Sequence, residues 1–70
     1  MFRFLVIIEK TEHNYSAYSP DLHGCVATGE TRDEAERTMH EAIQMHVDGL
    51  REDNLPIPES QTFAEYMAVN

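Results

Sequence analysis

Apolar and polar positions alternate over residues 2–9 in a way that predicts a β-strand. The two alternating sets are Phe2, Phe4, Val6 and Ile8 against Arg3, Leu5, Ile7 and Glu9. A period of two with β-branched side chains is typical of a strand. Both faces are apolar at the centre, and a single helix in a fold this small cannot cover both. We therefore expect Leu5 and Ile7 to form an interface between copies of the chain, in a dimer or a tetramer.

Two further strands are predicted before residue 30. The polar residues 12–14 are typical of a hairpin turn, which leads into a strand over residues 15–19 that Pro20 ends. Residues 21–24 form a tight connection to a third short strand over residues 25–29. The expected arrangement is a meander of three antiparallel strands.

A long helix is predicted to follow. Thr31 and Glu34 have the spacing of a capping box, in which each side chain satisfies a free backbone amide at a helix start. Asp53, Asn54 and the prolines at 56 and 58 end the pattern. One apolar stripe should lie on the sheet, and its members are Ala35, Met39, Ala42, Ile43, His46, Val47 and Leu50.

The end of the chain returns to strand character. Over residues 62–69, Phe63, Glu65, Met67 and Val69 alternate with three other residues. The predicted order is β-β-β-α-β, an α+β fold with one helix laid across a sheet, and we expect residues 1–70 to form a single domain.

Composition and charge limit the classes of function that the chain can have. The formal net charge is −8, which disfavours direct nucleic-acid binding and favours a basic partner. The single Cys25 excludes an internal disulfide and suits a reducing cytoplasm. No signal peptide is expected, and no apolar stretch reaches the roughly 20 residues of a membrane span.

No catalytic, cofactor or metal site is predicted. His40 and His46 are six residues apart, so on a helix they point in different directions, and His13 and His23 lie in turns. The acidic residues concentrate on the helix, where arginines interleave with them as on a solvated face. We therefore predict that the protein is not an enzyme.

Several motifs resemble those of the HicB-like antitoxin family. They occur in the family's order across most of the chain, and they are Tyr15-Ser16-Ala17-Tyr18, Pro20-Asp21-Leu22-His23-Gly24-Cys25, Gly29-Glu30-Thr31, Glu34-Ala35, Glu41-Ala42-Ile43 and Ile57-Pro58-Glu59. The resemblance implies a partial ribonuclease-H-like sheet and helix without nuclease chemistry. It also implies a partner, a small basic HicA-like toxin that cleaves mRNA and whose RNA-binding and catalytic surface the antitoxin covers.

The expected toxin-binding residues combine the aromatic strand, the turn and the exposed helix acids. They are Tyr15, Tyr18, Asp21, Leu22, His23, Glu36 and Glu41. Longer family members add a C-terminal DNA-binding domain, for which this sequence has no counterpart, so we expect none here. The alternative is a stand-alone regulatory module that binds a ligand or another protein, and a neighbouring gene for a small basic protein would distinguish the two.

Overall fold

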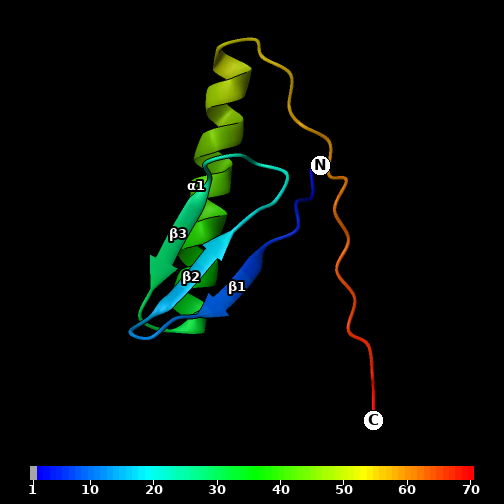
Figure 1. Ribbon diagram of the computed structural model, residues 1–70. Helices are drawn as coiled ribbons and strands as arrows, with labels where there is room; N and C mark the ends of the chain where they lie inside the picture. The colour runs from blue at the N-terminus through cyan, green and yellow to red at the C-terminus, as the bar shows by residue number, and fades with distance from the viewer. Residues whose placement is uncertain (1) are drawn as a thin grey trace.

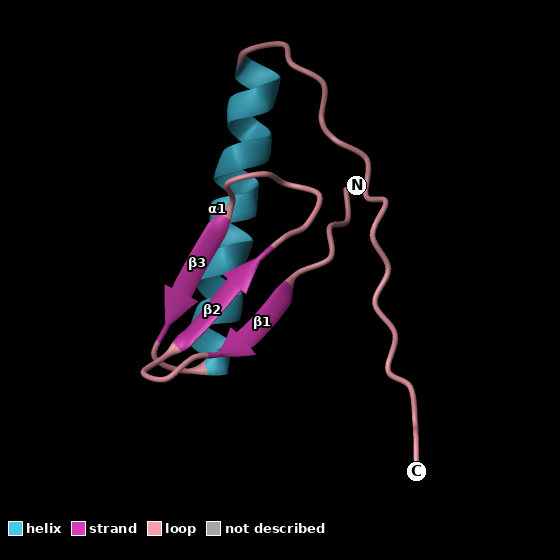
Figure 2. Ribbon diagram, in the orientation of Figure 1, coloured by secondary structure: helices cyan, strands magenta, loops and turns pink. Residues whose placement is uncertain are grey.

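Three antiparallel strands and one long helix form the folded part of the computed structural model, which describes residues 2–70 (Figure 1). The strands are β1 (Ile7–Lys10), β2 (Tyr15–Tyr18) and β3 (Val26–Gly29), in the sheet order β1-β2-β3. The helix α1 (Arg32–Glu52) crosses one face of the sheet (Figure 2). The predicted meander followed by a helix is confirmed. Within residues 2–70, no helix combines the length and the apolar character needed to cross a membrane.

The strand register decides which side chains meet the helix. Ile8 pairs with Ala17, and Ala17 pairs with Ala27. Ala17 and Ala27 are buried and Ile8 packs against them, so this row belongs to the inner face, under α1. Because side chains alternate along a strand, the neighbouring row of Ile7, Tyr18 and Val26 lies on the outer face.

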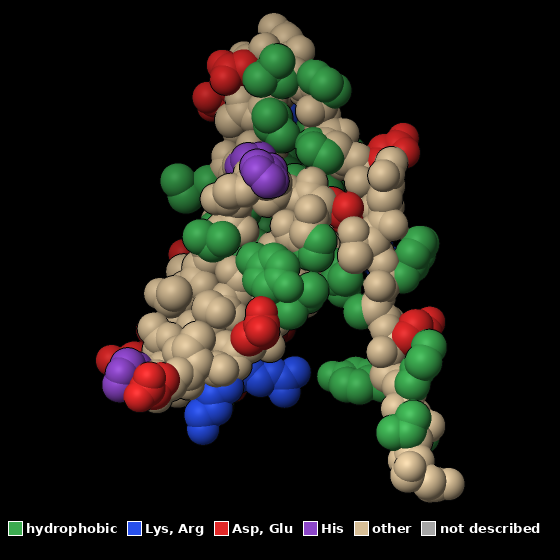
Figure 3. Space-filling model, viewed as in Figure 1, with side chains coloured by type: hydrophobic (Ala, Val, Ile, Leu, Met, Phe, Trp, Pro, Cys, Tyr) green, Lys and Arg blue, Asp and Glu red, His purple; other side chains and the backbone are tan. Residues whose placement is uncertain are grey.

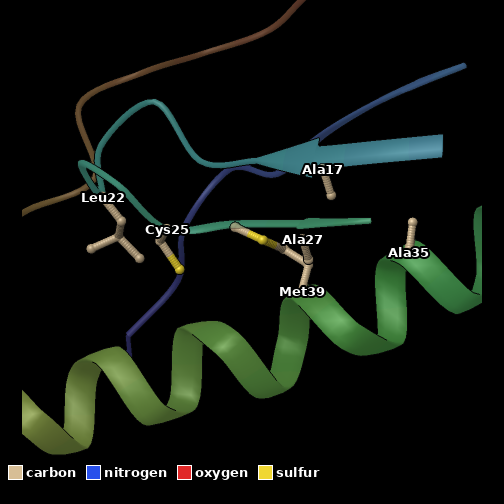
Figure 4. Packing of buried hydrophobic residues seen from close by; sticks show 6 residues of the cluster. All are labelled: Ala17, Leu22, Cys25, Ala27, Ala35 and Met39. Atoms are coloured by element: carbon tan, nitrogen blue, oxygen red, sulfur yellow. The ribbon is translucent and has the colours of Figure 1, made fainter. Parts of the chain in front are cut away.

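The core is small and lies between α1 and the strands β2 and β3. Its buried members come from the sheet, the β2–β3 turn and the helix (Figure 4), and they are Ala17, Leu22, Cys25, Ala27, Ala35 and Met39. Small side chains let the helix approach the sheet closely. At Gly29 a Cβ atom would lie 2.5 Å from the backbone nitrogen of Ala35, so the start of α1 packs directly against the end of β3.

Both ends of α1 are capped, and the helix begins and ends where the sequence predicts. The backbone N–H of Glu34 donates to the hydroxyl of Thr31 at 3.1 Å, which is one of the two hydrogen bonds of the predicted capping box. At the other end Asn54 has φ of 55°, and the N–H groups of Asn54 and Leu55 donate to the carbonyls of Arg51 and Leu50. This is a Schellman motif, and it ends the helix where the periodicity ends.

The predicted strand over residues 62–69 is wrong for the isolated chain. From residue 55 onwards the backbone forms no helix or strand, and Figure 1 shows it continuing apart from the sheet. Phe63, Met67 and Val69 are 88%, 83% and 90% exposed. Strand character requires a neighbouring strand to accept the backbone hydrogen bonds, and none is paired with this segment here.

The first strand is also shorter than predicted. It begins at Ile7 rather than at residue 2, because its partner β2 ends at Tyr18, opposite Ile7. Ser19 and Pro20 then turn away, and a proline nitrogen has no hydrogen to donate. Residues 2–6 continue beyond the sheet without a strand partner.

Candidate functional site

The outer face of the sheet is an apolar surface that α1 does not cover. The row of Ile7, Tyr18 and Val26 crosses all three strands. Val26 is 67% exposed and Tyr18 is 36% exposed. The row of Glu9, Ser16 and Thr28 beside it is polar. An apolar row with a polar border resembles the centre and rim of a protein interface.

Two of the sequence predictions meet on this outer face. Tyr18 was predicted to bind a toxin and Ile7 to join copies of the chain, and the register places them directly opposite one another. Leu5, two residues before Ile7, is half-buried, as Ile7 is. The two hypotheses therefore concern a single surface.

The turn between β2 and β3 has a structural role that the sequence did not predict. The Asp21 carboxylate accepts hydrogen bonds from the backbone N–H groups of Gln61 and Thr62 at 3.1 and 3.2 Å, and from the Thr62 hydroxyl at 2.9 Å. Asp21 thus anchors the chain 40 residues further on. No local signal connects residues this far apart in sequence.

The other predicted contact residues are dispersed. Leu22 is 1% exposed and belongs to the core, so it offers no free surface, whereas Tyr15 is half-buried and packs against the core with part of its side chain. His23 is exposed in the turn. Glu36 and Glu41 are exposed on α1, and they border a groove on the inner side of the sheet. The sheet therefore separates these two acids from Tyr18.

That groove, of about 1100 Å³, lies between α1 and the segment that contains β1. It forms because α1 packs mainly on β3 and β2 and only lightly on β1. Its apolar lining is Phe2, Phe4, Val6, Ile8, Ile43 and Val47. Three arginines and three carboxylates also line it, namely Arg32, Arg37 and Arg51 with Asp33, Glu36 and Glu41. The sequence contained one sign of this groove, the apolar alternation of residues 2–9.

Side chains that could support catalysis or metal binding are dispersed. Within residues 2–70, no three His, Cys, Asp or Glu side chains gather where they could hold a metal ion. Burial raises the pKa of the Cys25 thiol because desolvation disfavours the thiolate. The thiol is therefore a poor nucleophile. What the described surface offers instead is two apolar areas, the outer face and the groove.

Comparison with known proteins agrees with this architecture. Residues 4–70 match the family described as HicB_like antitoxin of bacterial toxin-antitoxin system. A chain of the solved HicA3 and HicB3 toxin-antitoxin complex superposes with a TM-score of 0.70 at 27% identity, covering 86% of this chain and 70% of that one.

Two relatives show the same similarity in sequence. A UPF0150 protein of Helicobacter pylori is 43% identical over 49 residues, 70% of this chain and 68% of that protein. An uncharacterized 14.9 kDa protein from the rep-hol intergenic region of Haemophilus phage HP1 is 36% identical over 62 residues, 89% of this chain. The match spans only 47% of the phage protein.

The fold and the two apolar surfaces define a small α+β protein suited to contact with other proteins. The family match extends over nearly the whole chain. The chain belongs to the HicB-like antitoxin family of bacterial toxin-antitoxin systems.

Proposed function

We propose that the chain is an antitoxin that neutralises a basic, HicA-like, mRNA-cleaving toxin by covering its RNA-binding and catalytic surface. The observation that carries this proposal is the likeness to a chain of the HicA3 and HicB3 toxin-antitoxin complex, at 27% identity and a TM-score of 0.70. The net charge of −8 is opposite in sign to that of a basic RNA-binding face, so the antitoxin and the toxin attract each other. The protein acts by binding and not as an enzyme, and it meets its partner in the cytoplasm.

The outer face of the sheet is the surface we assign to the toxin. Tyr18 lies at its centre between Ile7 and Val26. Glu9 adds a carboxylate to the neighbouring row. Aromatic residues at the centre of an interface often contribute most of its binding free energy. His23 and the turn that contains it extend the same contact.

Co-expression with the adjacent gene tests the function. If that gene encodes a small basic protein, its expression alone should stop growth, and this chain should restore growth and co-purify with it. A neighbour that is harmless, or that remains toxic without forming a complex, would favour a stand-alone binding module instead.

The assigned surface is tested by truncating Tyr18. Tyr18→Ala should raise the dissociation rate of the toxin complex by roughly 30-fold or more, because a central aromatic side chain typically contributes about 2 kcal/mol or more. Surface plasmon resonance with the purified toxin measures the rate. Leu55→Ala is the matched control, because Leu55 is 53% exposed but lies beyond the helix end. Equal effects of the two substitutions would remove the outer face from the proposal.

A further inference from the structure

The groove beside β1 lies where a fourth strand could pair with the sheet. β1 is an edge strand, since it pairs with β2 on one side only. Val6 and Ile8 pack against the core but stay partly exposed to the groove. Arg51 lies over the Phe2 ring at 5.3 Å and borders the same groove. An uncovered edge with an apolar floor is a site where another strand adds readily.

The extended segment, residues 62–70, has the alternation of apolar side chains expected of such a fourth strand. Phe63, Met67 and Val69 occupy alternate positions, as they would on one face of a strand. All three are more than 80% exposed, and Figure 3 shows hydrophobic side chains standing along this segment, apart from the body of the molecule. The segment and the stretch of residues 2–10 are equal in length.

We propose that the extended segment of one copy adds as a fourth strand to the β1 edge of a second copy, and that the exchange is reciprocal. Phe63, Met67 and Val69 fill the apolar floor of the partner copy's groove. Such an exchange is isologous, so the same contact forms twice about one twofold axis. The proposal goes beyond the antitoxin role and does not depend on it.

Charge favours this occupant over a basic toxin. The groove has three arginines and three carboxylates, so its formal charge is zero, whereas the whole chain has −8. It is therefore less attractive to a basic protein than the rest of the surface. The extended segment has one charged side chain, Glu65, and no Lys or Arg. Glu65 follows the same alternation as Phe63 and Met67, so in a strand it lies on the face turned to the groove, where arginines are available to pair with it.

The anchor at Asp21 favours exchange over closure onto the segment's own chain. Three hydrogen bonds hold Gln61 and Thr62 to that carboxylate. Immediately after this anchor, Phe63 is 88% exposed. In Figure 1 the chain continues from there without joining its own sheet. The anchor therefore presents the segment outward.

The exposed apolar side chains of the segment supply a large part of the area that a dimer interface needs. One exposed ring per copy, that of Phe63, becomes covered. A buried aromatic residue covers roughly 150–250 Å². The two Phe63 rings of a reciprocal exchange therefore cover roughly 300–500 Å², about a third to a half of the roughly 1,000 Å² expected of a biological interface. Met67, Val69 and the paired backbone add to it.

Cysteine crosslinking between two differently substituted chains tests the exchange. Both chains contain Cys25→Ser. One also contains Val6→Cys, and the other contains a cysteine substitution at Phe63, Glu65 or Met67, which scans the register. Mild oxidation of the mixture should give a disulfide-linked pair for at least one of the three combinations.

Two outcomes would overturn the proposal. The first is a crosslink that forms only within a chain containing both substitutions and never in the mixture, because the segment would then cover its own groove. The second is no crosslink in any combination, which would leave the groove to a different partner. Toxin is absent throughout, so failure here is distinct from failure of the proposed function.

The dimer dissociation constant is a second measurement, and it separates loss of the exchange from a local loss of folding. Phe63→Ala with Met67→Ala should raise the dimer dissociation constant at least 100-fold in analytical ultracentrifugation, while circular dichroism keeps the helix signal. Ala64→Ser with Ala68→Ser is the matched control, because these positions face away from the groove in a strand. Equal effects of the two pairs, or a monomeric parent chain at micromolar concentration, would contradict a groove-facing strand.

Discussion

At the scale of single residues, the contact between β3 and α1 depends on the absence of one side chain. A Cβ on Gly29 would lie 2.5 Å from the nitrogen and 2.9 Å from the Cα of Ala35. Both are backbone atoms, so no side chain can rotate away. Gly29 is the residue that allows the buried Ala35 to approach the sheet.

Gly29→Ala should therefore lower the free energy of unfolding by about 2 kcal/mol, as an overpacked core position does. Gly49→Ala is the matched control, because nothing lies within 4 Å of its Cβ position and it belongs to α1. That substitution should stabilise the protein by about 0.5–1 kcal/mol through helix propensity. Urea unfolding at one fixed protein concentration measures both. A neutral Gly29→Ala would mean that the helix moves away from β3 easily.

The sequence predicts the element in which a residue lies better than it predicts what the side chain of that residue contacts. The strand containing Tyr18 was predicted, but which of its faces the helix covers follows from the packing of α1 against Ala17 and Ala27. Leu22 was expected at an interface and lies in the core. Exposure of one side chain in a turn depends on packing by distant segments, and the sequence around Leu22 does not contain that information.

At the scale of elements, α1 could be predicted almost to its ends and the last strand could not. Helix limits are determined by local groups, here the Thr31 hydroxyl at the start and the left-handed Asn54 at the end. A strand depends on a neighbour that is distant in sequence. Residues 62–69 have the correct alternation, yet the isolated chain supplies no pairing for them.

The helix start provides a test of that local control. Thr31→Ala removes the acceptor of the Glu34 amide and should reduce stability by about 1 kcal/mol. For a domain this small, the melting temperature should fall by roughly 4–8 °C. Thr31→Ser should restore most of the loss, and Thr38→Ala on the exposed side of α1 should cause none. A melting temperature unchanged by Thr31→Ala would show that packing alone positions the helix start.

At the scale of the whole molecule, the sheet divides the surface into two regions of different charge. The groove side has equal numbers of arginines and carboxylates. The outer face has Glu9, and the hairpin after β1 adds Glu12. A basic partner should therefore be attracted more strongly towards the outer face.

Charge reversal distinguishes the two sides. Glu9→Lys with Glu12→Lys, and Glu36→Lys with Glu41→Lys, each change the net charge from −8 to −4, since every reversal adds two. The first pair should slow association with the toxin more, because screening limits steering to roughly 8 Å at physiological salt. Stopped-flow association at two ionic strengths measures the difference. A larger effect from the helix pair would place the toxin on the groove side.

Asp21 connects these two regions of the molecule through one carboxylate. It belongs to the turn that we assign to the toxin contact, and it also holds the root of the extended segment. Toxin binding that immobilises the turn also restricts the extended segment, so the segment loses less conformational entropy when it later pairs with another copy. The converse holds when pairing comes first. Thermodynamic linkage makes such coupling reciprocal. Pairing between copies should therefore raise the affinity for the toxin by the same factor by which bound toxin raises the affinity of the pairing.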